Sequence, residues 1–161
     1  MNKKKDDIAL TPFTSTFYVA YAGPTGPFQG NVITTVETVH RDTYNQVIGC
    51  AREILLDSVV INNQTYYPPI NRNRNLAYSR SFSLVNSYSV SGTCRSCSSG
   101  TKLFNDAVRR RFLQTLAASS NSRSNSTALF NAASLVNLNA AGITQVTSVS
   151  ATNAVPLTLM N

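Results

Sequence analysis

Two segments of the chain alternate between apolar and polar side chains, which is the pattern of a β-strand with one buried face. In the first, one face of residues 13–21 carries Phe13, Ser15, Phe17, Val19 and Tyr21. In the second, one face of residues 81–91 carries Phe82, Leu84, Asn86, Tyr88 and Val90. The other face of the second strand is almost entirely serine, so we expect it to meet either solvent or a hydrogen-bonded contact surface.

Apolar residues at helical spacing predict two or three helices. The first is predicted over 43–57 and could begin as early as residue 32, although Gly49 weakens it by about 1 kcal/mol relative to alanine. Further helices are predicted over 102–117 and over 127–138, the latter ended by Gly142. Residues 61–78 are predicted to form a loop, because the Pro68-Pro69 pair within them forces an extended backbone.

These elements predict one α+β domain, in which a small antiparallel sheet carries two or three helices on one face. The strands come from residues 13–21, 82–90 and the C-terminal segment. We expect residues 1–11 to be an exposed arm, 12–142 to be the domain, and 143–161 to be an extended tail without charge. The tail is predicted to be ordered only against a partner chain; the alternative is that it closes its own sheet as a further strand.

Uncharged polar residues dominate the composition. The 161 residues include 19 Ser, 17 Thr and 17 Asn, and only 13% are charged, about half the usual share of roughly 25%. Net charge keeps free proteins apart in solution. A chain so poor in charged side chains therefore suits an assembly, although a soluble domain with a Ser/Asn bias would look the same.

The formal net charge is nevertheless +7, which allows an acidic partner such as nucleic acid. Arginines in the loop 66–80 could contact phosphates, and its tyrosines could stack on bases. The residues concerned are Arg72, Arg74, Arg80, Tyr66, Tyr67 and Tyr78. A second basic run, Arg109–Arg111, would fan around a helix and form no single stripe.

No catalytic motif is present, so we expect no enzymatic activity and no cofactor. The sequence has no Gly-x-Ser-x-Gly elbow, Walker loop or Gly-x-Gly-x-x-Gly run. Cys94 and Cys97 supply half of a tetrahedral zinc site. Cys50 and His40 could complete it, but on one helix they lie about 15 Å apart. The alternative is that Cys94 and Cys97 are thiols able to form a disulfide after release into an oxidising medium.

No apolar run reaches the length of about 18 residues that a membrane span needs. Lys3–Lys5 precede Asp6 and Asp7 rather than an apolar segment, so no secretory signal is expected. With only three cysteines, synthesis in a reducing intracellular compartment is the simplest interpretation. The glycosylation sequons at Asn63 and Asn125 are then expected to be unused.

Three features together resemble small structural proteins of large DNA virus particles, such as minor capsid or cement proteins. They are the run Asn71-Arg72-Asn73-Arg74-Asn75, the serine-alternating strand 81–91 and the charge-free tail. The resemblance implies a virion component that bridges major capsid proteins in a hetero-oligomeric assembly. We expect the termini to pair with neighbouring chains by strand addition, the arginines to neutralise acidic neighbours, and the apolar tail to fill pockets through Val155, Leu157 and Leu159.

Overall fold

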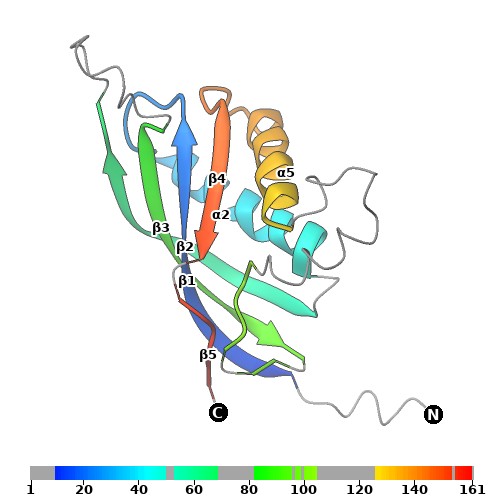
Figure 1. The fold of residues 1–161 in the computed structure, drawn as a ribbon. Helices are drawn as coiled ribbons and strands as arrows, with labels where there is room; N and C mark the ends of the chain where they lie inside the picture. The colour runs from blue at the N-terminus through cyan, green and yellow to red at the C-terminus, as the bar shows by residue number, and fades with distance from the viewer. Residues whose placement is uncertain are drawn as a thin grey trace, which may run out of the picture.

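The computed structural model describes residues 10–49, 53–68, 82–95, 97–98, 100–104, 126–153 and 155–160. Within these ranges, five antiparallel strands form one sheet, and two α-helices lie together on one of its faces (Figure 1). The predicted α+β class, with a small antiparallel sheet and two or three helices, is therefore confirmed. None of the described helices is long and apolar enough to cross a membrane.

The central strand of the sheet is β1 (Thr11–Ala22). It pairs on one side with β3 (Leu84–Cys94), which in turn pairs with the edge strand β2 (Ile54–Tyr66). On its other side, β1 pairs first with β5 (Thr158–Leu159) and then with β4 (Ser148–Asn153). With α2 (Asn31–Tyr44) and α5 (Ser126–Ala140), the order β1-α2-β2-β3-α5-β4 is a split β-α-β arrangement.

An aromatic core lies between the sheet and the helices. The inner face of β1 buries Phe13, Phe17 and Tyr21, as the alternation predicts. Phe17 stacks on Tyr88 of β3 with ring centroids 5.3 Å apart, and its edge contacts Phe104 and Phe130. Such pairs contribute about 0.5–1.5 kcal/mol each beyond the apolar area that they bury. Strand β1 therefore contributes three aromatic rings to the core.

Side chains cover the outer edge of β2. The Asn45 amide accepts a hydrogen bond from the Leu56 N–H (2.8 Å) and donates one to the Leu56 carbonyl (3.0 Å), in the manner of a neighbouring strand. Further along, the Glu37 carboxylate accepts from the Ile61 N–H at 2.8 Å. Unpaired edges invite other strands to add, and these side chains occupy two positions at which an incoming strand would bond.

The predicted helix over 43–57 is only partly correct. Helix α2 begins at Asn31, as the earlier start allows, and continues through a π-helical turn, η1 (Asn45–Gly49). The chain then reverses, and the residues from Ile54 onward form β2 rather than helix. A side chain at Gly49 would place its Cβ 2.2 Å from the Ile54 carbonyl oxygen, so glycine permits this close reversal. The predicted loop likewise begins later, because residues 61–66 belong to β2.

The helix predicted over 127–138 is confirmed as α5. Gly142 has a φ of 98°, and the Ile143 N–H bonds to the Leu138 carbonyl at 2.9 Å, which is a usual glycine-dependent helix end. The helix predicted over 102–117 is wrong at its start, because residues 102–104 are not helical and instead place Leu103 and Phe104 in the core. Residues 105–117 lie outside the described part of the chain.

The prediction that residues 143–161 are ordered only against a partner chain is wrong. Strands β4 and β5 both pair with β1 of the same chain, so the tail closes its own sheet. Ile143, Val146, Val149 and Leu157 are buried in the core. Most of the apolar tail residues are thus covered within the protein's own fold, where α5 packs against β4, whereas Val155 and Met160 stay exposed.

We predict that Leu157→Ala lowers the free energy of unfolding by about 2–5 kcal/mol, because it leaves a cavity at a fully buried position. Val155→Ala, two residues earlier and 45% exposed, should change it by less than about 0.5 kcal/mol. Urea denaturation of both variants measures the difference. Equal, small effects would mean that the C-terminal segment does not pack on its own sheet.

Candidate binding surface on the open face of the sheet

The face of the sheet opposite the helices is lined mainly by hydroxyl groups. The pairing registers place side chains of neighbouring strands in rows that run across this face. One row joins Thr158, Thr14, Ser91 and Ser58, and the next joins Thr16, Ser89 and Val60. This open face therefore offers an array of groups that can each donate and accept a hydrogen bond.

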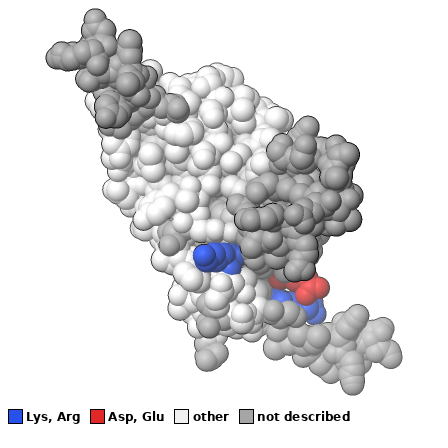
Figure 2. Space-filling view, in the orientation of Figure 1, with Lys and Arg blue, Asp and Glu red and all other residues white. Residues whose placement is uncertain are grey.

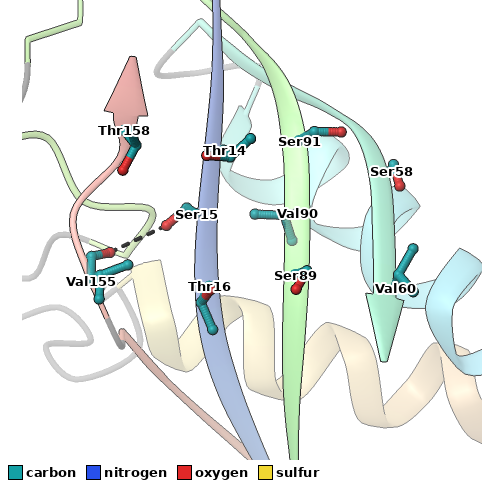
Figure 3. A pocket seen from close by; sticks show the side chains of 10 residues that line it. All are labelled: Thr14, Ser15, Thr16, Ser58, Val60, Ser89, Val90, Ser91, Val155 and Thr158. Atoms are coloured by element: carbon teal, nitrogen blue, oxygen red, sulfur yellow. Dashed lines mark hydrogen bonds between the residues drawn. The ribbon is translucent and has the colours of Figure 1, made fainter. Parts of the chain in front are cut away.

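A hollow of about 450 Å³ crosses the open face at these two rows (Figure 3). The Ser15 hydroxyl donates a hydrogen bond to the Val155 carbonyl at 3.2 Å, which fixes the segment that forms one end of the hollow. Val60, Val90 and Val155 are its apolar lining residues. Its remaining surface is mostly hydroxyl, from Thr14, Thr16, Ser58, Ser89, Ser91 and Thr158. The lining includes no charged residue, so a neutral, partly apolar group fits it best.

Exposed apolar side chains gather on the same face. Four of the eight large hydrophobic residues that stand exposed among the described residues belong to it: Tyr18, Leu55, Val60 and Val155. Scattered exposed apolar residues need no explanation, whereas a group of them on one face indicates an interaction site. Leu129 and Val136, on the outer side of α5, are exposed as well but lie away from the sheet.

Few charged side chains belong to the described part of the chain, and none of them lines the hollow. Those within the described ranges are Glu37, Arg41, Asp42, Glu53, Asp57, Arg95 and Lys102. Arg41 pairs with Asp42 at 3.0 Å and Arg95 with Glu53 at 3.6 Å, while Asp57 is exposed in a bulge of β2 next to Ser58. Figure 2 shows one side of the molecule, on which few of the described residues are charged.

The predicted nucleic-acid loop is described only at its start. Tyr66 ends β2 and pairs with Leu84, which places it on the helix-covered side of the sheet, packed against the core. The Tyr67 N–H bonds to the Ser83 carbonyl at 2.7 Å. Arg72, Arg74, Tyr78 and Arg80 lie outside the described residues, as do Arg109–Arg111. The nucleic-acid role of this loop therefore stays a prediction, and Tyr66 is the one of its tyrosines that the structure packs against the core.

The three predicted tail residues have different surroundings. Val155 is exposed and lines the hollow, so it can contact a partner. Leu157 is buried in the protein's own core, and Leu159 packs against that core from β5. Sequence reasoning did not single out Thr14, Thr16, Tyr18 or Ser89 as site residues. The alternation in both strands is the signal that could have found them, once β1 and β3 are paired.

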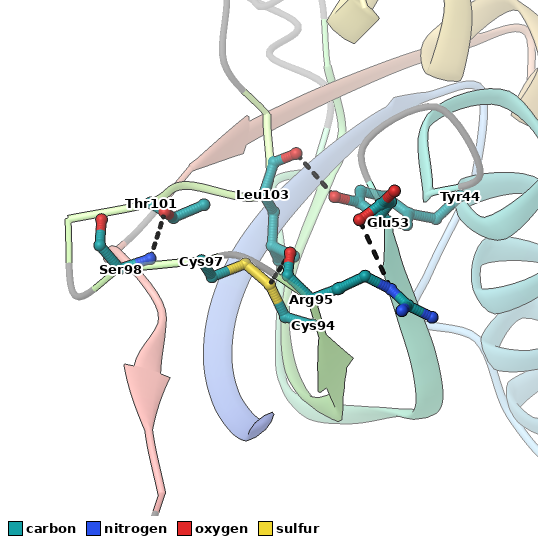
Figure 4. The surroundings of a disulfide bond; sticks show 8 residues. All are labelled: Tyr44, Glu53, Cys94, Arg95, Cys97, Ser98, Thr101 and Leu103. Atoms are coloured by element: carbon teal, nitrogen blue, oxygen red, sulfur yellow. Dashed lines mark hydrogen bonds and ion pairs between the residues drawn. A yellow bond between two sulfur atoms is a disulfide. The ribbon is translucent and has the colours of Figure 1, made fainter. Parts of the chain in front are cut away.

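Cys94 and Cys97 are joined by a disulfide, with their Cα atoms 5.9 Å apart (Figure 4). Cys94 is buried at the end of β3 rather than in a turn. The bond ties β3 to the segment that carries Leu103, whose carbonyl accepts a hydrogen bond from the Tyr44 hydroxyl at 2.8 Å. This pairing is the one expected for two thiols that meet an oxidising medium.

The disulfide leaves neither sulfur atom as a thiolate for a metal. Within the described ranges, no three His, Cys, Asp or Glu side chains are grouped as a metal site would require. Both ring nitrogens of His40 are hydrogen-bonded to other side chains, those of Tyr21 and Ser134. Cys50 lies outside the described residues. The two cysteines that form half of a zinc site in the sequence analysis are thus joined to each other by the disulfide.

His40 is held in a buried polar chain between the helices and the sheet. Its Nε2 lies 2.6 Å from the Tyr21 hydroxyl, which bonds in turn to the Tyr88 hydroxyl. Its Nδ1 lies 3.3 Å from the Ser134 hydroxyl of α5. The Asn86 amide donates to the Tyr88 oxygen at 3.3 Å, so the hydroxyls can donate in sequence toward Nε2, which leaves the imidazole proton on Nδ1.

This chain of hydrogen bonds joins both helices to the sheet. Burial lowers the pKa of His40 to about 3, and it raises the pKa values of Tyr21 and Tyr88 above their usual 10. All three groups therefore stay neutral near pH 7. They are fully buried, and none lines the hollow on the open face. The network instead fixes α2 and α5 against β1 and β3.

We predict that the free energy of unfolding falls by about 2 kcal/mol between pH 7 and pH 5. The unfolded chain binds a proton at His40 near pH 6.5, whereas the folded protein does so only near pH 3, so stability is lost as the pH drops below 6.5. Urea denaturation at each pH measures the slope. The His40→Gln variant should show a flatter dependence of the free energy of unfolding on pH, whether or not the substitution itself changes stability. An unchanged slope in that variant would contradict the buried neutral imidazole.

We also predict that reducing the disulfide lowers the free energy of unfolding by about 2 kcal/mol, the loop-entropy value for a ring of roughly four residues. Urea denaturation with and without reductant measures this. The double variant Cys94→Ala/Cys97→Ala is the control and should not respond to reductant. A thiol titration should count one free thiol per oxidised chain, and three would show that the bond is absent.

In comparisons with protein-family models, with curated proteins and with solved structures, the chain matched none. The split β-α-β arrangement hosts many unrelated functions, so the order of strands and helices does not indicate one. The chemistry of the open face is therefore the feature from which a function can be inferred.

Proposed function

We propose that this protein is a non-catalytic structural component of a larger assembly, and that it binds its neighbours through the open face of the sheet. The observation that carries the proposal is the composition of that face. It combines four exposed apolar side chains with rows of hydroxyl groups, and no charged residue lines its hollow. The centres of protein–protein interfaces are likewise depleted of charge and rich in apolar and aromatic groups.

The covered edge of β2 favours binding through the face over strand addition. Asn45 and Glu37 already occupy backbone groups of Leu56 and Ile61, so an added strand would have to displace both side chains. The hydroxyl rows of the open face need no such rearrangement. A neighbour that lies on the face can form hydrogen bonds and cover Leu55 and Val60 in one step.

A non-catalytic role is supported by the state of the groups that could do chemistry. The only histidine is buried with both ring nitrogens bonded, and the Cys94–Cys97 pair is a disulfide. Within this proposal the assembly is a virion shell and the neighbours are capsid-type proteins. What supports that part is the resemblance in composition: abundant Ser and Asn and few charged side chains.

A matched pair of valines tests the proposal. Val60 on the open face and Val136 on α5 are both exposed, by 48% and 64%. We expect Val60→Lys to be excluded from the native assembly, because it would bury an unpaired charge in the interface, whereas Val136→Lys should join it. The measurement is the amount of each variant that co-sediments with the assembly, at low and at high salt.

The salt series separates the alternative function. An interface without charges should survive about 1 M salt, whereas binding to phosphates through arginines would weaken steeply. Equal incorporation of both lysine variants, or release of the wild-type chain as salt rises, would contradict binding through the open face. Release by salt would favour the nucleic-acid alternative that the loop 66–80 suggests.

A further inference from the structure

We propose that the open face binds a second copy of the same chain, related by a two-fold axis, and that Tyr18 of each copy fills the hollow of the other. This rests on the proposed function, because it uses the same face and names one partner for it. In a two-fold interface the same patch is used twice, so each contact of residue i with residue j is repeated as j with i. The patch must therefore be complementary to itself.

Hydroxyl chemistry makes the face self-complementary. A Ser or Thr hydroxyl donates one hydrogen bond and accepts others, so two identical hydroxyl rows can pair without a change of chemistry. The row Thr158–Thr14–Ser91–Ser58 crosses the sheet and can meet its own copy in this way. A row of lysines or of carboxylates could not, because like charges would face one another.

The distribution of charge points to the same face. The chain has a formal charge of +7, so two copies repel one another in general. The hollow has no charged lining residue, and Asp57 is the described charged residue nearest to it in sequence. A contact centred on the hollow therefore buries none of its lining residues as a charged group.

An exposed tyrosine and the hollow lie next to each other on this face. Tyr18 is two residues along β1 from Thr16, which lines the hollow, and 44% of its surface is exposed. Because residues i and i+2 of a strand share a face, Tyr18 points to the same side as the hollow. A two-fold axis that passes between them places each tyrosine in the opposite hollow.

The hollow suits a tyrosine. Val60 and Val155 offer apolar contact to a ring, and the hydroxyls of Thr14, Thr16, Ser89 and Ser91 offer partners to a phenolic oxygen (Figure 3). At about 450 Å³ it has room for an aromatic side chain. Tyrosines in well-packed pockets often dominate the energetics of an interface.

Sedimentation equilibrium of the full-length chain over a range of concentrations tests the proposal. We expect a monomer–dimer equilibrium that persists at high salt. Tyr18→Ala should weaken the dimer by about tenfold or more, whereas Tyr18→Phe, which keeps the ring, should weaken it much less. Thr14→Lys should abolish it, and the matched control Thr38→Lys, exposed on α2, should leave it unchanged. Circular dichroism and urea denaturation check that each variant is folded.

Two results would overturn the second-copy proposal: a wild-type chain that stays monomeric at every concentration, or a dimer that survives both Tyr18→Ala and Thr14→Lys. Co-sedimentation of the Val60→Lys and Val136→Lys variants then separates the two claims. If the wild-type chain is monomeric but the Val60→Lys variant is still excluded from the assembly, the open face binds a different protein. In that case only the choice of a second copy as the partner is wrong. If Val60→Lys has no effect either, both proposals fail.

Discussion

The alternation of side chains along β1 is the constraint on which the rest of the structure depends. Because successive residues of a strand point to opposite faces, Phe13, Phe17 and Tyr21 build the core while Thr14, Thr16 and Tyr18 form the outer surface. β1 also pairs with three other strands, including both strands of the C-terminal segment. A shift of one residue in its register would expose the aromatic face and bury the hydroxyl face.

Under the proposed function, the inner face of the sheet provides stability and the outer face provides the binding surface. On the inner face, aromatic packing and the His40 network hold the helices without any exposed reactive group. On the outer face, hydroxyl and apolar side chains accumulate on the side of the sheet opposite the two described helices. No charged residue lines the hollow, and four of the described charged residues form ion pairs with one another. Under the proposed function, specificity would come from shape and hydrogen bonding.

The sequence predicts what is periodic and local, and misses what is long-range. The strands of residues 13–21 and 82–90 and the helix α5 follow from their repeating patterns. The helix predicted over 43–57 is partly wrong because the apolar residues at the end of the observed helix and those at the start of β2 together follow one helical period. That period continues across the reversal after Gly49. The prediction that the tail needs a partner chain is wrong because the surface that covers Leu157 comes from segments distant in the sequence. For the same reason the His40 network and the hollow need the pairing of β1 with β3, which no local pattern reveals.

The central claim is that the open face is the surface that binds other chains. Hydroxyl-radical footprinting of the protein, isolated at low concentration and within its native assembly, tests this most directly, because it compares exposed side chains on two sides of one molecule. The account predicts that Tyr18, Leu55 and Val60 become protected on assembly, while Leu129 and Val136 on α5 keep their reactivity. Protection of the α5 residues, with the sheet residues still reactive, would contradict it.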